Sequence, residues 1–122
     1  MRLTIHEAPR LQADVMTKWV RKSYREKWDN RVAEAVMIWR SEHREAWKRF
    51  PLKRAYVCFT LYSKRRPDPT NLAYAFKAPE DALVSAGVLV NDQAENYVGE
   101  SPEWRWEKTS GKTFITIDIE ED

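Results

Sequence analysis

Acidic and basic residues that could act on a phosphodiester lie together in one segment, 64–92, which reads KRRPDPTNLAYAFKAPEDALVSAGVLVND. The basic run at 64–66 leads directly to Asp68, and Asp92 follows a short apolar run. Hydrolysis of a phosphodiester requires an activated water and a positive charge beside the leaving oxygen, and Mg²⁺ held by one or two carboxylates supplies both. The segment therefore predicts a site for a phosphate backbone and a divalent cation.

Each of the two aspartates also has an ordinary structural explanation. We expect Asp68 at the end of a strand, where Pro69 holds its backbone out of the helical region, and Asp92 at the end of the run that begins after Gly87. An isolated aspartate at such a position most often caps a helix or closes a turn. The residue types alone leave both a metal site and a pair of caps open.

Lys77 and Asp81 stand four residues apart, so they share a face of any helix that includes both. In one interpretation they form an exposed ion pair that contributes well under about 1 kcal/mol to stability. In the other interpretation Lys77 contacts a phosphate and Asp81 lies near the metal.

Chain length limits how Asp68 could meet Asp92. A helix over residues 71–86 would be about 24 Å long, and the five residues 88–92 could return at most roughly 17 Å. The meeting therefore requires a helix that begins later, which Pro79 permits because proline is tolerated in a first helical turn. A kink at Pro79 and a site completed by a partner subunit are the alternatives; we favour one chain supplying both acids.

Charge is distributed unevenly along the chain. The first 66 residues hold 17 Lys/Arg against 7 Asp/Glu, and the rest hold 4 against 12. In a candidate basic arm, 10–28, Lys22 and Arg25 alternate with Trp19, Tyr24 and Trp28, a composition that can hold a phosphate backbone and stack on exposed bases. Alternatively, the aromatic rings pack inward and the charges only keep the arm solvated.

The elements that must position these residues follow from periodicity. Alternating residues predict strands at 1–7, 54–63 and 113–119, the last paired as a hairpin with an irregular strand at 96–108. Residues 10–50 contain neither Pro nor Gly and predict helix, which Asp29 and Asn30 divide into the arm and a main helix over 30–49. We expect one domain, 1–122, of the α+β class: a small mixed four-stranded sheet packed against two main helices, in the order β-α-β-α-β-β.

The 64–92 segment resembles the motif of the RusA-type Holliday junction resolvases of bacteria and their phages. The matching features are D-P-x-N-L at 68–72, the lysine at 77, D-A-L at 81–83, A-G-V-L at 86–89 and the aspartate at 92. The resemblance implies a magnesium-dependent homodimer that cuts four-way DNA junctions by paired symmetric nicks. It also implies that Asp68 and Asp92 bind Mg²⁺ and that Lys77 serves catalysis or phosphate binding. The residues expected to contact DNA are Lys64, Arg65, Arg66, Asn71, Lys22 and Arg25.

Two positions depart from the family motif. Thr70 stands where the family has an acidic residue, and Asn91 replaces the first acid of a pair. A neutral hydroxyl is a weaker ligand for a divalent cation than a carboxylate. A non-catalytic or weakly catalytic protein of the same fold that binds branched DNA is therefore the alternative function, and a small protein-binding domain is a third.

Composition excludes several other classes. The single cysteine rules out an internal disulfide, and a reducing cytoplasm is the expected compartment. The chain has no apolar run long enough to span a bilayer and no glycine-rich nucleotide fingerprint, so we expect neither a membrane partner nor a nucleotide cofactor.

Overall fold

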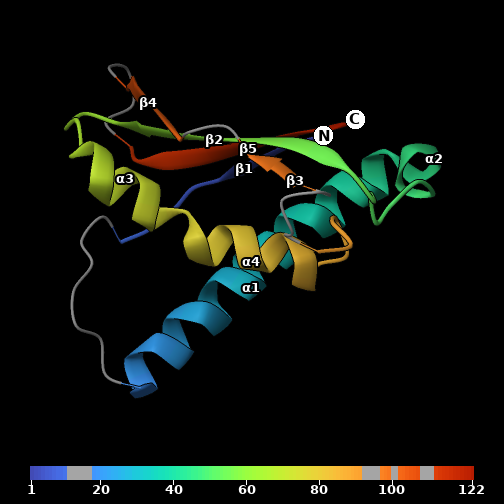
Figure 1. Cartoon of the computed structure of the whole chain (residues 1–122), viewed down its shortest axis with the longest axis horizontal. Coiled ribbons are helices and arrows are strands. Elements are labelled where there is room, and N and C mark those ends of the chain that lie inside the picture. Colours follow the sequence, from blue (N-terminus) through green and yellow to red (C-terminus); the bar gives the residue numbers. More distant parts are fainter. Residues whose placement is uncertain (11–17, 92–96, 100–101, 108–111) are drawn as a thin grey trace.

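The computed structural model describes residues 1–10, 18–91, 97–99, 102–107 and 112–122. The elements in these ranges are β1 (Arg2–Ile5), α1 (Lys18–Glu42), α2 (Arg44–Trp47), β2 (Ala55–Ser63), α3 (Pro69–Ala75), α4 (Lys77–Ser85), β3 (Tyr97–Gly99), β4 (Glu103–Trp106) and β5 (Phe114–Glu121). The helices lie on one side of the sheet (Figure 1). The expected α+β class is therefore confirmed. No helix in the described ranges is long and apolar enough to cross a bilayer.

The sheet is mixed, and its strand order is β1-β5-β2-β3. β5 pairs antiparallel with both β1 and β2, whereas β3 and β4 pair parallel with β2. β3 lies beside Ala55–Val57 at the start of β2, and β4 lies beside Thr60–Ser63 at its end. The two short strands thus follow one another along the same edge of the sheet. Five strands therefore form a sheet that is four strands wide, where we expected four strands.

The predicted hairpin between the last two strands is wrong, because β2 separates β5 from β4. On β5 the residues Ile115, Ile117 and Ile119 are all buried, and a strand with such an apolar face belongs between two neighbours. β4 carries the exposed, ion-paired Glu103 and Arg105, which suit a sheet edge.

α1 runs without interruption through Asp29 and Asn30, so the predicted break there is also wrong. Trp28, Val32 and Val36 recur every four residues on its buried face. Because this face packs across the expected boundary, tertiary contacts keep the helix continuous where local capping preferences would allow an end. The break comes instead at His43, which has the non-helical dihedrals φ −132° and ψ 53°.

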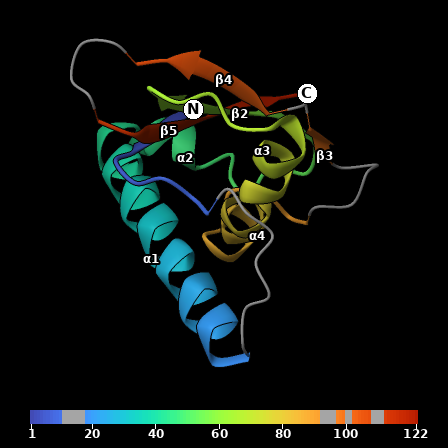
Figure 2. The same ribbon diagram turned by 90° about the vertical axis from the view of Figure 1, so that its left-hand side faces the viewer.

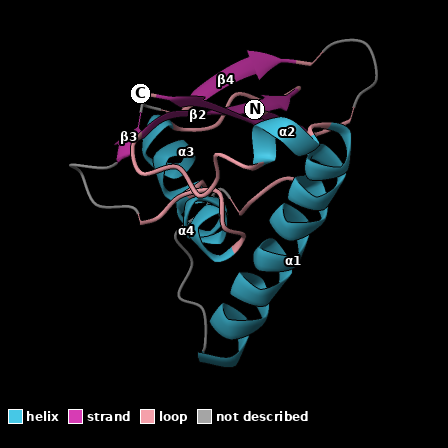
Figure 3. Cartoon of the chain, turned by 90° about the vertical axis from the view of Figure 1, so that its right-hand side faces the viewer, coloured by secondary structure: helices cyan, strands magenta, loops and turns pink. Residues whose placement is uncertain are grey.

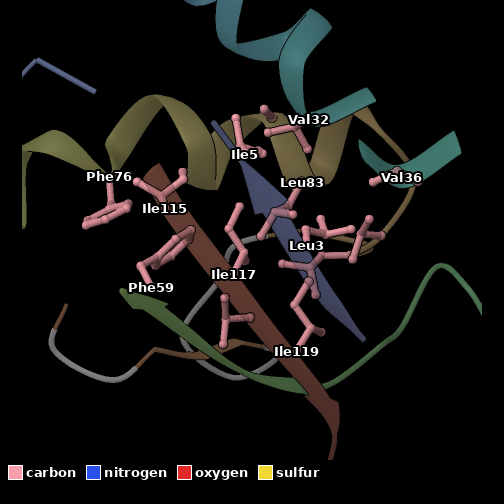
Figure 4. Packing of buried hydrophobic residues seen from close by; sticks show 14 of the residues in the cluster. Leu3, Ile5, Val32, Val36, Phe59, Phe76, Leu83, Ile115, Ile117 and Ile119 are labelled. Atoms are coloured by element: carbon pink, nitrogen blue, oxygen red, sulfur yellow. The ribbon is translucent and has the colours of Figure 1, made fainter. Parts of the chain in front are cut away.

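One hydrophobic core joins the sheet to the helices. Figure 4 shows Leu3 and Ile5 of β1 beside the β5 isoleucines, with Val32, Val36 and Leu83 above them. Phe59 of β2 stacks on Phe76 between α3 and α4, with 4.9 Å between the ring centroids. This ring contact holds the α3–α4 unit beneath β2. α1 packs on α4 and β1.

The N-terminal half of α1 extends beyond this core. Figures 2 and 3 show α1 starting far from the sheet and approaching it only in its C-terminal half. In the projecting half Trp19 is 75% exposed, Tyr24 is half-buried and Trp28 is fully buried. The aromatic residues of the basic arm are thus divided between the two interpretations: the last ring belongs to the core, and the first faces solvent.

Candidate nucleic-acid and metal site

Asp68 lies on the exposed turn between β2 and α3, where it is the N-cap of α3. Its Oδ1 accepts a hydrogen bond from the backbone N–H of Thr70 at 2.9 Å, and its carbonyl oxygen accepts one from the N–H of Leu72 at 2.9 Å. Extended dihedrals at Asp68 and a proline at the first helical position complete the start of the helix. The capping interpretation of Asp68 is confirmed. A carboxylate can bind Mg²⁺ through a single oxygen, so this bond is compatible with coordination at Oδ2.

Three basic residues lie immediately before this cap. Lys64, Arg65 and Arg66, which we call the basic segment, follow the last residue of β2, and all three are exposed. The hydroxyl of Ser63 donates a hydrogen bond to the backbone oxygen of Arg65 at 2.9 Å, which holds the segment against the end of the strand. The structure therefore brings the basic segment and Asp68 to one end of β2, as the sequence predicts. Asn71 is half-buried in the first turn of the adjoining α3.

Lys77 and Asp81 form the exposed ion pair that their spacing predicts, with 3.0 Å between Nζ and Oδ1. α4 begins at Lys77 with Pro79 in its first turn, but α3 already begins at Pro69, so two short helices that meet at Phe76 replace the single late-starting helix that we expected. Asp81 lies thirteen residues of nearly continuous helix after Asp68, roughly 20 Å of helical rise. Two ligands of one Mg²⁺ lie no more than about 4 Å apart. The position of Asp81 does not support a cation shared with Asp68 in one chain.

The ion pair instead lines a groove between the projecting half of α1 and the α3–α4 unit. This α1–α4 groove has a volume of about 130 Å³, and its lining residues are Arg21, Tyr24, Arg25, Tyr74, Ala75, Lys77, Ala78 and Asp81. Of the expected DNA contacts, Arg25 faces this groove, while Lys22 lies with Trp19 on an adjoining hollow of α1. Arg21, Arg25 and Lys77 are cationic, and Asp81 is the one carboxylate among the lining residues, so the groove favours an anion.

Arg21, a residue of the basic arm, and Tyr74 both line this groove, although neither was among the residues expected to contact DNA. Arg21 lies one helical turn before Arg25, so the spacing rule that pairs Lys77 with Asp81 could have found it. Nothing local distinguishes Tyr74, which is 43% exposed and lies on the groove because α4, which follows α3, packs on α1.

The chain leading to Asp92 lies at the other end of β2. Leu52, three residues before β2, donates its N–H to the carbonyl of Val88 at 2.9 Å and accepts a hydrogen bond from Val90 at 3.1 Å. Asp92 itself lies outside the described residues. Further along the chain, β3 also pairs with the first residues of β2.

Asp68 and the 88–90 run are therefore separated by the length of the α3–α4 unit, roughly 25 Å from Asp68 to the end of α4. Figure 1 shows the same separation, with α3 beneath one end of β2 and the end of α4 near the other. The apolar run 88–90 pairs with Leu52 and does not return along the helices toward Asp68. Our preference for one chain supplying both acids depends on Asp92, which the structure does not describe, so that preference and the partner-subunit alternative both stay predictions.

Among the residues that the structure describes, no group of three or more His, Cys, Asp or Glu side chains is arranged to hold a metal ion. Comparison of the chain with models of known protein families, and with curated proteins, found no match. The resemblance of 64–92 to the resolvase motif stays a prediction from the sequence.

Two substitutions separate the capping role of Asp68 from its charge. Asp68→Ala removes the acceptor for the N–H of Thr70, and we expect the free energy of unfolding to fall by about 0.5–2 kcal/mol. Asp68→Asn keeps a capping oxygen, and we expect a change of only a few tenths of a kcal/mol. Urea denaturation followed by circular dichroism measures both. Equal losses in the two variants would show that the charge, and not the cap, stabilises α3.

Proposed function

We propose that this chain is a magnesium-dependent endonuclease that acts on branched DNA, cutting four-way junctions by paired nicks as a homodimer. The observation that carries the proposal is the meeting of the basic segment with Asp68 at one exposed end of β2. Cations there can hold the phosphate backbone, while the carboxylate can hold Mg²⁺ beside it. The resemblance of 64–92 to the resolvase motif supports the same reaction.

Each metal site in this proposal is made by two chains. Asp68 of one chain and Asp92 of the other are the carboxylate ligands in this proposal; what supports it is that the 88–90 run pairs with Leu52, before the start of β2, whereas Asp68 follows its end. A two-fold axis that brings the end of one β2 toward the start of the other creates the same contact twice. Two identical sites then face two strands of a symmetric junction.

Bound Mg²⁺ would activate a water and stabilise the charge on the leaving oxygen. The residues of this chain have more limited tasks. The basic segment orients the phosphate, and Asp68, fixed by its capping bond, presents an oxygen at a defined place. Lys77 and the arginines of the α1–α4 groove bind a neighbouring stretch of backbone. Thr70 adds a neutral oxygen donor.

A second candidate function is binding of branched DNA without efficient cleavage. Three observations favour it: one oxygen of Asp68 is used in a cap, Thr70 is not a carboxylate, and Lys77 is paired with Asp81. Both functions use the same cationic surface, so they differ in cleavage and not in affinity.

Cleavage of a strand-labelled four-way junction distinguishes the two functions. We expect paired nicks that require Mg²⁺ and that disappear in Asp92→Asn, while junction affinity is kept or increased because a negative charge near phosphate is removed. Asp68→Asn, which keeps the cap, should behave in the same way. Tight junction binding without nicks in the wild-type protein would favour the second function, and nicks that survive Asp92→Asn would contradict the proposed metal site.

The salt dependence of binding tests the basic segment. Replacing Lys64, Arg65 and Arg66 with Ala should weaken junction binding and reduce the slope of log K against log salt by about 2–3, since each phosphate contact contributes close to one unit. Arg2, Lys27 and Arg31 provide a matched control, because each already forms an ion pair with a carboxylate of the chain. The control triple variant should leave the slope nearly unchanged. Equal reductions would mean that total charge, and not the basic segment, determines binding.

A further inference from the structure

Trp106 is a large exposed aromatic residue on the edge strand β4, at the same end of β2 as Asp68. It is 62% exposed, and it pairs in register with Ser63, the last residue of β2 before the basic segment. The N–H of Glu107 donates to the carbonyl of Ser63 at 3.1 Å, so the backbone on both sides of Trp106 is held to β2. The indole is thus carried on an ordered strand, with most of its surface open to solvent.

The neighbouring tryptophan connects β4 to the basic segment. Trp104 donates its indole N–H to the hydroxyl of Ser63 at 2.9 Å, and the same hydroxyl donates to the carbonyl of Arg65 at 2.9 Å. The guanidinium of Arg66 lies over the Trp104 ring, 5.8 Å from its centroid, as in a cation–π contact. Two tryptophans and three cations are therefore organised as one unit around the end of β2.

We propose that Trp106 is a stacking platform for an unpaired nucleobase, whose phosphates are held by Lys64 and Arg65. Nucleobases present flat π faces that stack on tryptophan regardless of sequence, and the adjoining backbone requires cations. An exposed indole that pairs in register with Ser63, directly before this run of cations, offers both contacts. Trp104 is half-buried and takes the supporting role of fixing the basic segment.

This inference deepens the proposed function, on which it rests for the choice of DNA. The unpaired base would be one displaced at the branch point of a junction or within a single-stranded segment. A fully paired duplex keeps its bases stacked on one another and offers no face to Trp106. The platform therefore favours unpaired DNA over duplex.

Fluorescence anisotropy with labelled single-stranded DNA, a four-way junction and a duplex tests the platform. We expect Trp106→Ala to raise the Kd for single-stranded DNA by about 5- to 100-fold, to raise the junction Kd in the same direction, and to leave the duplex Kd unchanged. Trp106→Phe should keep most of the affinity because it retains a π face, whereas Trp106→Leu should behave like Ala. Met37→Ala is the matched control: it removes an exposed apolar side chain on α1, away from β4, and should leave all three Kd values unchanged.

The outcomes separate this inference from the proposed function. Junction binding that is equal in wild type and Trp106→Ala overturns the platform and leaves the endonuclease proposal standing. Base-dependent binding through Trp106 in a protein that makes no nicks supports the platform and contradicts the endonuclease. A change in oligomeric state on sedimentation of Trp106→Ala, with unchanged DNA affinity, would identify a protein contact and overturn the platform.

Discussion

The length of β2 constrains everything else in this fold. Its nine residues span roughly 30 Å, and the α3–α4 unit that follows runs back beneath it over a similar distance. The turn after β2 presents the basic segment and Asp68, while the hydrogen bonds of Leu52 hold the residues before Asp92 at the start of the strand. A strand held on both sides by neighbours cannot bend to bring these ends together. The separation between Asp68 and the 88–90 run is thus set by the length of β2 and by the backbone pairing of that run with Leu52.

The packing of the core explains why the separation between Asp68 and the 88–90 run is rigid. Phe59 and Phe76 stack beneath the middle of β2, and the buried face of α1 packs on α4, so neither helix can slide along the sheet without exposing these side chains. The exposed functional groups lie outside this core, on turns, an edge strand and the projecting half of α1. Such an arrangement allows surface charges and aromatic rings to contact DNA without any change in the packed interior.

Local patterns in the sequence predicted the strands near 1–7, 54–63 and 113–119 and the ion pair between Lys77 and Asp81, because each depends on residues within a few positions of one another. Long-range pairing was harder to predict. β5 lies between β1 and β2 because its buried isoleucines require a paired strand on each side. α1 is continuous because Trp28 packs against residues far away in the sequence. The separation of Asp68 from the 88–90 run depends on the pairing of that run with Leu52, and no spacing rule in the sequence predicts this pairing. The alternative of a partner subunit was visible from chain length alone, although the fold was needed to favour it.

The measurement that tests this account most directly is complementation between two inactive variants. An Asp68→Asn chain and an Asp92→Asn chain are mixed under conditions that exchange subunits, and native mass spectrometry confirms the mixed dimers. A site made from two chains leaves one intact site in each mixed dimer, so equal mixing should restore junction nicking to about a quarter of the wild-type rate, one strand at a time. If each chain supplies both acids of its own site, every site in the mixture carries a substitution. Nicking would then stay at the level of the single variants, and that result would contradict the two-chain site.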